Sequence, residues 1–180
     1  MSEYTTVFLR NKNTPLLEYR EYPSNAGAEN LSNDDIMRII RETDEYNRTV
    51  RKSFGCELFH LSTTPSRELD VLRWCSSPQT LTVEMLDMVL AFYNEEIEGY
   101  KKAIARYKAT IAKLETRILK ANVELYDKIS KDIDEYYDSI QDFEEELENK
   151  QYLYNKFYFA KSILDNKSNA EDYELVYTKC

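Results

Sequence analysis

The sequence predicts a mainly α-helical protein, in which a small α+β head with a short β-hairpin carries a long antiparallel helical hairpin or coiled-coil arm. Three observations predict this class. Glycine and proline are scarce, with 3 and 4 among 180 residues, and neither occurs after Gly99, so no strong helix breaker follows. Apolar residues recur there at spacings of three and four, as in a coiled coil. Alternating β-branched and aromatic runs, typical of strands, lie towards the two ends.

The same patterns divide the chain into three segments. Residues 1–78 are expected to form the α+β head, and residues 79–166 the long helical hairpin or coiled coil. Residues 167–180 contain the run YELVYT and are expected to be a strand or tail that returns to the head. A chain of 180 residues is enough for one domain of ordinary size, or for a small domain with an extension.

The head begins with two short runs that are typical of strands. TTVFLR (5–10) and PLLEYREY (15–22) are rich in β-branched and aromatic residues. The four residues between them, from Asn11 to Thr14, favour a turn. We therefore expect a β-hairpin over residues 4–22.

A helix is expected over residues 33–54. Ser32 is a favourable N-cap, and Asp35 three residues later gives an acidic variant of the capping box. Apolar residues then recur at helical spacing, and Gly55 stands where a glycine commonly ends a helix.

The rest of the head gives weaker signals. CELFHL (56–61) fits either a buried strand or a linker. A short helix is expected over residues 65–75, because Thr64 can cap it and Pro65 suits its first position.

The second half carries an apolar seam that changes phase once. If the first series continued in phase beyond residue 125, Lys128 and Asp132 would be core residues, but the series instead resumes one residue late. The two series are residues 97, 100, 104, 107, 111, 114, 118, 121 and 125, and then Ile129, Ile133, Tyr136, Ile140, Phe143 and Leu147.

Two structures explain the change of phase. One is a single helix of about 80 residues, roughly 120 Å long, that pairs with a second copy. The other is a turn between residues 122 and 132 that folds two helices into a hairpin. Residues 101–131 hold nine Lys or Arg and three acidic residues, whereas residues 132–148 hold nine acidic residues and no basic one. This opposition of charge favours the hairpin, whereas the absence of Gly and Pro near the turn counts against it.

After the seam comes the most aromatic part of the chain, YLYNKFYFAKSIL, within residues 151–164. Its apolar residues occupy more than one helix face, which predicts that it is covered on more than one side.

Charge and cysteine content disfavour several classes of protein. The net charge of −9 disfavours wholesale attraction to phosphate backbones or anionic lipid. We therefore expect neither nucleic acid nor a membrane as direct partner, although Lys and Arg interleave with Tyr100 and Tyr107 in a way that could suit a phosphate backbone. The three cysteines have no CxxC or CxxH spacing, and no apolar run approaches 18 residues. We expect a cytoplasmic protein, in the host cytoplasm if a phage encodes it, without a cofactor.

Candidate chemistry is sparse. Asp134, Asp138 and Asp142 repeat at four-residue spacing, but one histidine in the chain is too few for a helical di-metal site, so we expect no metal site. Cys56 and His60 would share a helix face and form a nucleophile–base pair if residues 56–61 were helical. A packed cysteine and a hydrogen-bonded histidine are the commoner outcome, and we expect no enzyme; the pair is the lesser alternative.

The stretch DIDEYYDSIQDFEEELE (132–148) is the strongest functional signal. On a helix its apolar residues form one stripe and its carboxylates spread over the remaining surface, about 5–6 Å apart at spacings of three and four. Such a row approaches the charge spacing of a nucleic-acid strand, although any solvated acidic helix produces it too. The expected partner-binding residues are Asp132, Asp134, Glu135, Tyr137, Asp138, Asp142, Glu145 and Glu146.

These features favour a binding protein. We expect an inhibitor that occupies a basic, nucleic-acid-handling groove of a partner enzyme by mimicry and steric block. In composition and size, though in no motif, the chain resembles the small acidic anti-defence and anti-CRISPR inhibitors of phages. The alternative is a structural coiled-coil adaptor that forms a homodimer through the seam. Residues 152–159, which are aromatic, compete with the acidic face as the contact surface.

Overall fold

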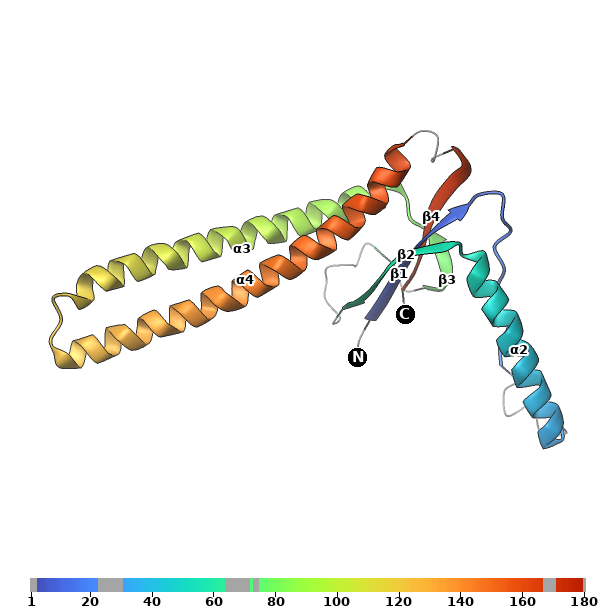
Figure 1. Ribbon diagram of the computed structural model, residues 1–180, viewed down its shortest axis with the longest axis horizontal. Coiled ribbons are helices and arrows are strands. Elements are labelled where there is room, and N and C mark those ends of the chain that lie inside the picture. Colours follow the sequence, from blue (N-terminus) through green and yellow to red (C-terminus); the bar gives the residue numbers. More distant parts are fainter. Residues whose placement is uncertain (1–2, 23–30, 64–71, 73–74, 167–170, 180) are drawn as a thin grey trace. The chain divides into compact units, whose positions relative to one another are not determined.

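The computed structural model describes residues 3–22, 31–63, 72, 75–166 and 171–179 (Figure 1). The chain divides into two compact units. We call residues 1–86 and 159–180 the sheet unit, and residues 87–158 the hairpin unit. Each unit is described by itself. The mainly helical class with a long antiparallel helical pair and a small sheet is confirmed.

The sheet unit contains a four-stranded antiparallel sheet in the order β2-β1-β4-β3. The strands are β1 (Glu3–Asn11), β2 (Cys56–Thr63), β3 (Cys75–Thr80) and β4 (Tyr173–Lys179). The expected return of the C-terminal run to the N-terminal strand is confirmed, because β4 pairs with β1 over seven residues, from Thr5↔Lys179 to Asn11↔Tyr173. The run CELFHL is a strand rather than a linker.

The expected β-hairpin over residues 4–22 is wrong in its second strand. Residues 15–22 form no strand, because β2 and β4 occupy both edges of β1. The segment instead runs beside α2 (Asn33–Ser53), to which Leu17 N donates a hydrogen bond at Ser53 Oγ (3.3 Å) and Arg20 N donates one at Asn47 Oδ1 (2.9 Å). Leu17 of this segment packs against the buried cluster that includes Val50 and Phe54.

The expected short helix over 65–75 lies outside the described residues, except at Leu72 and Cys75. Cys75 begins β3, so the helix assignment is wrong at that residue. β3 contains Pro78, which has no N–H to give to a ladder. An edge position, which β3 holds in this sheet, is where a strand tolerates proline.

The helix expected over residues 33–54 is confirmed as α2. Ser32 is its N-cap and its hydroxyl accepts a hydrogen bond from Asp35 N at 3.1 Å. Gly55 follows the C-cap with a φ of 100°, a backbone conformation that favours glycine. Gly55 therefore ends the helix and turns the chain into β2.

The C-terminal end of α2 packs on the sheet (Figure 1). Phe8 of β1 and Val176 of β4 form a buried cluster with Val50 of the helix and its C-cap Phe54. Nearby, Arg10 is buried and pairs with Glu174, its neighbour across the β1–β4 ladder, at 2.6 Å between Nη1 and Oε1. The carboxylate of Glu174 thus compensates the positive charge of Arg10, which would be costly to bury without a partner.

Two helices make up the hairpin: α3 (Val83–Ile118) and α4 (Val123–Asp165). The turn over residues 119–122 replaces the single continuous helix, and it accounts for the change of phase in the seam. It overlaps the expected window of 122–132 only at Asn122. No glycine is needed, because the side chain of Asn122 caps α4 by accepting a hydrogen bond from Leu125 N at 3.0 Å.

Apolar and aromatic packing holds the hairpin unit together. Ile104 and Ile111 of α3 form a buried cluster with Ile140 of α4. Tyr107 lies between Tyr136 and Phe143, with ring centroids 5.3 and 5.5 Å away. Between residues 101–118 of α3 and residues 132–148 of α4, all of them described, a single ion pair crosses, from Lys108 Nζ to Glu144 Oε1 at 2.9 Å. Charge therefore contributes less to the pairing of α3 with α4 than the opposite charges of residues 101–131 and 132–148 predicted.

The aromatic end of α4 is covered on one side. Leu153, Phe157 and Ala160 are buried, whereas Tyr152 and Tyr158 are more than half exposed. The expectation of cover on more than one side is thus wrong. The exposed rings gain contact with neighbours on the helix surface, as Tyr158 does with Tyr154 at 6.0 Å between centroids.

Tyr93→Phe should stabilise the protein by about 1 kcal/mol. Tyr93 is fully buried, and in the described part of the chain its hydroxyl has no hydrogen-bond partner. Burial also raises the pKa of this hydroxyl above its ordinary value of 10.0. Because the unfolded state then ionises first, the wild type loses stability as pH rises above 10, and the advantage of the variant should grow there. Urea unfolding of the wild type and of Tyr93→Phe at pH 7 and pH 10.5 measures both effects. If the difference in stability between the two proteins is the same at both pH values, the account of the Tyr93 hydroxyl is wrong.

Candidate functional site

The acidic row expected on residues 132–148 lies on the outer face of α4. Its helix stripe Ile133, Tyr136, Ile140, Phe143 and Leu147 faces α3 in the hairpin core. At 3.6 residues per turn, the opposite face carries five carboxylates, all exposed. These are Asp134, Glu135, Asp138, Asp142 and Glu145, which we call the acidic row.

Other members of the expected site lie on the flanks of the helix. Asp132 is half-buried beside the seam and does not belong to the row. Glu146 is exposed, and its charge helps to raise the pKa of Tyr100, for which burial is the larger cause. Tyr137 is exposed by 52%. The structure thus brings together five of the seven expected carboxylates and places one tyrosine beside them.

Most carboxylates of the row have no counter-charge within the described residues. Glu135 is 3.7 Å from Lys131 Nζ, and Glu145 accepts a hydrogen bond from Gln141. No ion pair of the described chain involves Asp134, Asp138 or Asp142. Like charges at a spacing of four residues repel by a few tenths of a kcal/mol per pair, so Asp134, Asp138 and Asp142 have a small cost that no described ion pair offsets.

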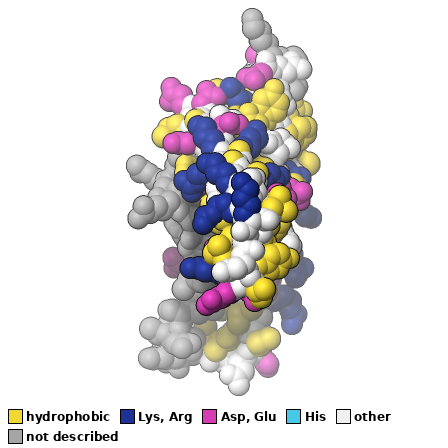
Figure 2. Space-filling model, turned by 90° about the vertical axis from the view of Figure 1, so that its left-hand side faces the viewer, with side chains coloured by type: hydrophobic (Ala, Val, Ile, Leu, Met, Phe, Trp, Pro, Cys, Tyr) yellow, Lys and Arg dark blue, Asp and Glu magenta, His cyan; other side chains and the backbone are white. Residues whose placement is uncertain are grey.

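The end of the hairpin is a surface of opposite character. Leu119 and Val123 are exposed by 84% and 81%. Lys and Arg side chains gather around this end (Figure 2), and those exposed there are Lys113, Arg117, Lys120, Lys128 and Lys131. The seam read from the sequence already leaves out Leu119 and Val123, and both lie at the turn between α3 and α4, where they are exposed.

The Cys56–His60 pair is not assembled by this fold. Both residues lie on β2, where four residues span about 13 Å. Cys56 Sγ contacts Glu57 O at 3.7 Å, whereas His60 Nδ1 is hydrogen-bonded to Thr6 Oγ1 at 2.7 Å. In the described residues no three His, Cys, Asp or Glu side chains converge in a way that could hold a metal ion.

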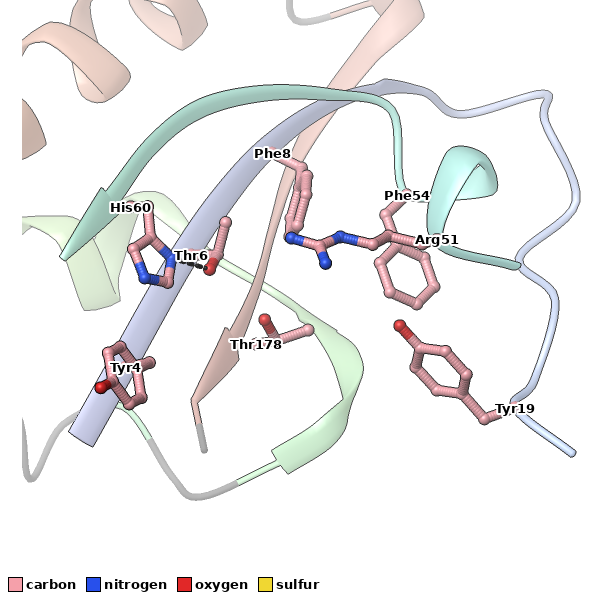
Figure 3. Close-up of a pocket in the computed structure, with 8 residues that line it drawn as sticks. All are labelled: Tyr4, Thr6, Phe8, Tyr19, Arg51, Phe54, His60 and Thr178. Carbon is pink, nitrogen blue, oxygen red and sulfur yellow. Dashed lines mark hydrogen bonds between the residues drawn. The ribbon is translucent and has the colours of Figure 1, made fainter. Parts of the chain in front are cut away.

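A cavity of about 320 Å³ lies on the α2 side of the sheet (Figure 3). One end is formed by Tyr4 and His60, whose rings stack at 5.5 Å between centroids. The other end is formed by Phe54 and Tyr19, whose rings meet edge to face at 5.6 Å. The cavity is therefore bounded by aromatic rings at both ends.

The floor of this cavity is a polar row in register across three strands. His60 of β2 pairs with Thr6 of β1, and Thr6 pairs with Thr178 of β4. Arg51, on the last turn of α2, extends its guanidinium over the same space (Figure 3). The sequence offered no signal for this grouping, because the residues come from positions 4 to 178.

Comparison of the chain with models of protein families, with curated proteins and with solved structures found no match. No helix in the described part of the chain combines the length and the apolar character needed to cross a bilayer.

Proposed function

We propose that this chain is a non-enzymatic binding protein that inserts the acidic row of α4 into a basic, nucleic-acid-handling groove of a partner protein. The observation that carries the proposal is the row itself. Asp134, Asp138 and Asp142 repeat every four residues, which is about 6 Å along the helix axis, and no described cation neutralises them. The helix is also braced by the core of the hairpin, so it offers the row in a preorganised form.

Charge and contact area act together in this mechanism. A row of carboxylates steers the protein towards a basic groove, and the bulk of the hairpin then excludes nucleic acid. Exposed Tyr137 beside the row adds contact area at low entropic cost. Tyr152, also exposed, lies seven residues beyond Glu145 and so continues the same side of α4.

Reversal of the three aspartates should abolish partner capture. The full chain is immobilised and exposed to nuclease-treated lysate of its native host, and captured proteins are identified by mass spectrometry. The combined variant Asp134→Lys, Asp138→Lys and Asp142→Lys should weaken capture of a nucleic-acid-binding protein at least about tenfold, and added salt should weaken capture by the wild type.

The matched control changes three exposed acids of the sheet unit, as Glu18→Lys, Glu42→Lys and Glu45→Lys. Net charge changes equally, yet capture should persist. An oligonucleotide should compete with the wild type for the captured protein. Capture that is indifferent to the oligonucleotide or to the aspartate reversal would contradict the mimicry.

The alternative function, a structural homodimer through the seam, requires a different arrangement of α3 and α4. The seam residues already pack between α3 and α4 of one chain, so such a dimer would have to open the hairpin. We expect light scattering to report a monomer, whereas a dimer that dissociates when the seam is disrupted would favour the structural role.

A further inference from the structure

We propose that the cavity between α2 and the sheet binds a small ligand that joins a planar ring to an anionic group, as a nucleoside monophosphate does. This binding site is independent of the acidic row. Its volume, about 320 Å³, falls at the lower end of the range for small-molecule sites.

The ring is recognised by the aromatic ends of the cavity. Tyr4 and His60 already stack with an interplanar angle of 19°, and Tyr4 is 45% exposed, so one more planar ring can extend the stack. Phe54 bounds the opposite end and is nearly fully buried, which fixes the distance between the two ends. Stacking on tyrosine and histidine is a common way for proteins to hold a base.

The anionic group is recognised by Arg51. Its guanidinium lies 3.9 Å from Glu57 Oε2, at the outer limit of an ion pair, and both side chains are largely exposed. That loose pair leaves most of the five N–H donors of the guanidinium available to an anion. Arg51 stands on the last turn of α2, and its guanidinium lies next to Phe8 in the cavity wall (Figure 3).

The polar floor supplies the remaining donors and acceptors. Thr6 Oγ1 is paired with His60, which fixes the imidazole ring. No hydrogen bond in the described chain involves the hydroxyl of Thr178, whose side chain lies in the cavity between Thr6 and Tyr19 (Figure 3). A half-buried hydroxyl that faces an open space lined by rings and a guanidinium is suited to a polar ligand atom.

Calorimetric titration of the full chain with the four common nucleoside 5′-monophosphates tests the proposal. We expect at least one to bind at micromolar to low millimolar concentration, and the matching nucleoside or inorganic phosphate alone to bind at least about tenfold more weakly, because each makes half of the contacts. Arg51→Gln should weaken binding at least about tenfold.

Arg41→Gln is the matched control, since it removes one exposed positive charge from the same helix away from the cavity. Thr178→Val is a second variant that keeps the size of the side chain and should also weaken binding. Circular dichroism checks that each variant folds. The proposal is overturned if no monophosphate binds at about 5 mM, which is weaker than the expected affinity, or if Arg51→Gln and Arg41→Gln bind equally.

Discussion

Ile140→Asp should open the helical hairpin, with a loss of at least about 4 kcal/mol in the free energy of unfolding. Ile140 is 5% exposed and lies against Ile104 and Ile111 at the centre of the hairpin core. The change removes a buried aliphatic side chain, which costs about 2–3 kcal/mol. It also places a carboxylate between two helices without a counter-charge, which costs several kcal/mol more. A total stability of about 5–15 kcal/mol leaves little margin for such a loss.

Asn149→Asp is the matched control, because it adds the same charge at an exposed position of the same helix. Urea unfolding followed by circular dichroism should show a large loss for Ile140→Asp and less than about 0.5 kcal/mol for the control. Similar behaviour of the two variants would mean that Ile140 does not lie in a packed seam, and the antiparallel pairing of α3 and α4 would then be wrong.

The hairpin could be predicted because its signals are local. Ile133, Ile140 and Leu147 share a stripe whatever the rest of the chain does, since helical periodicity fixes it. The position of the turn was less determined, because the sequence has no glycine or proline there. What decides it is the cap of Asn122 on α4, a single side-chain hydrogen bond that periodicity does not register.

The sheet was harder to predict because its pairings are distant in sequence. Residues 15–22 carry a good strand pattern, yet β1 already has Cys56–Thr63 on one side and Tyr173–Lys179 on the other. Local propensity cannot weigh a nearby strand against two remote ones, and tertiary contact overrides it. The edge strand that contains Pro78 was missed for a related reason, since its place in the sheet and not its composition permits the proline.

The two candidate sites, the acidic row and the cavity, also differ in whether local sequence could predict them. The acidic row could be found from the sequence, because four-residue spacing on one helix determines which side chains share a face. Asp132 lies apart from the row, and the structure shows that this residue is half-buried. The cavity could not be found, because His60, Thr6 and Thr178 become neighbours only through the register of three strands.

Gly55→Ala should destabilise the sheet unit by about 3 kcal/mol or more. The backbone at Gly55 has a φ of 100°, which costs a residue with a side chain roughly 1–3 kcal/mol. A Cβ there would also meet Leu9 O and lie 2.8 Å from Arg10 Cα, both of them backbone atoms of β1 that cannot rotate away. The chain would have to move β2 away from β1 to admit one methyl group.

Gly99→Ala makes the opposite prediction and serves as the control. Gly99 lies inside α3, and a Cβ at that position would meet nothing within 4 Å. Alanine should therefore stabilise the helix by about 0.5–1 kcal/mol, because it loses less backbone entropy on folding. Thermal unfolding measures both changes, and hydrogen exchange of the amides in β1 and β2 should quicken only in Gly55→Ala. If alanine is tolerated equally at the two positions, the close approach of β1 to the end of α2 is wrong, and the cavity that depends on it has no fixed wall.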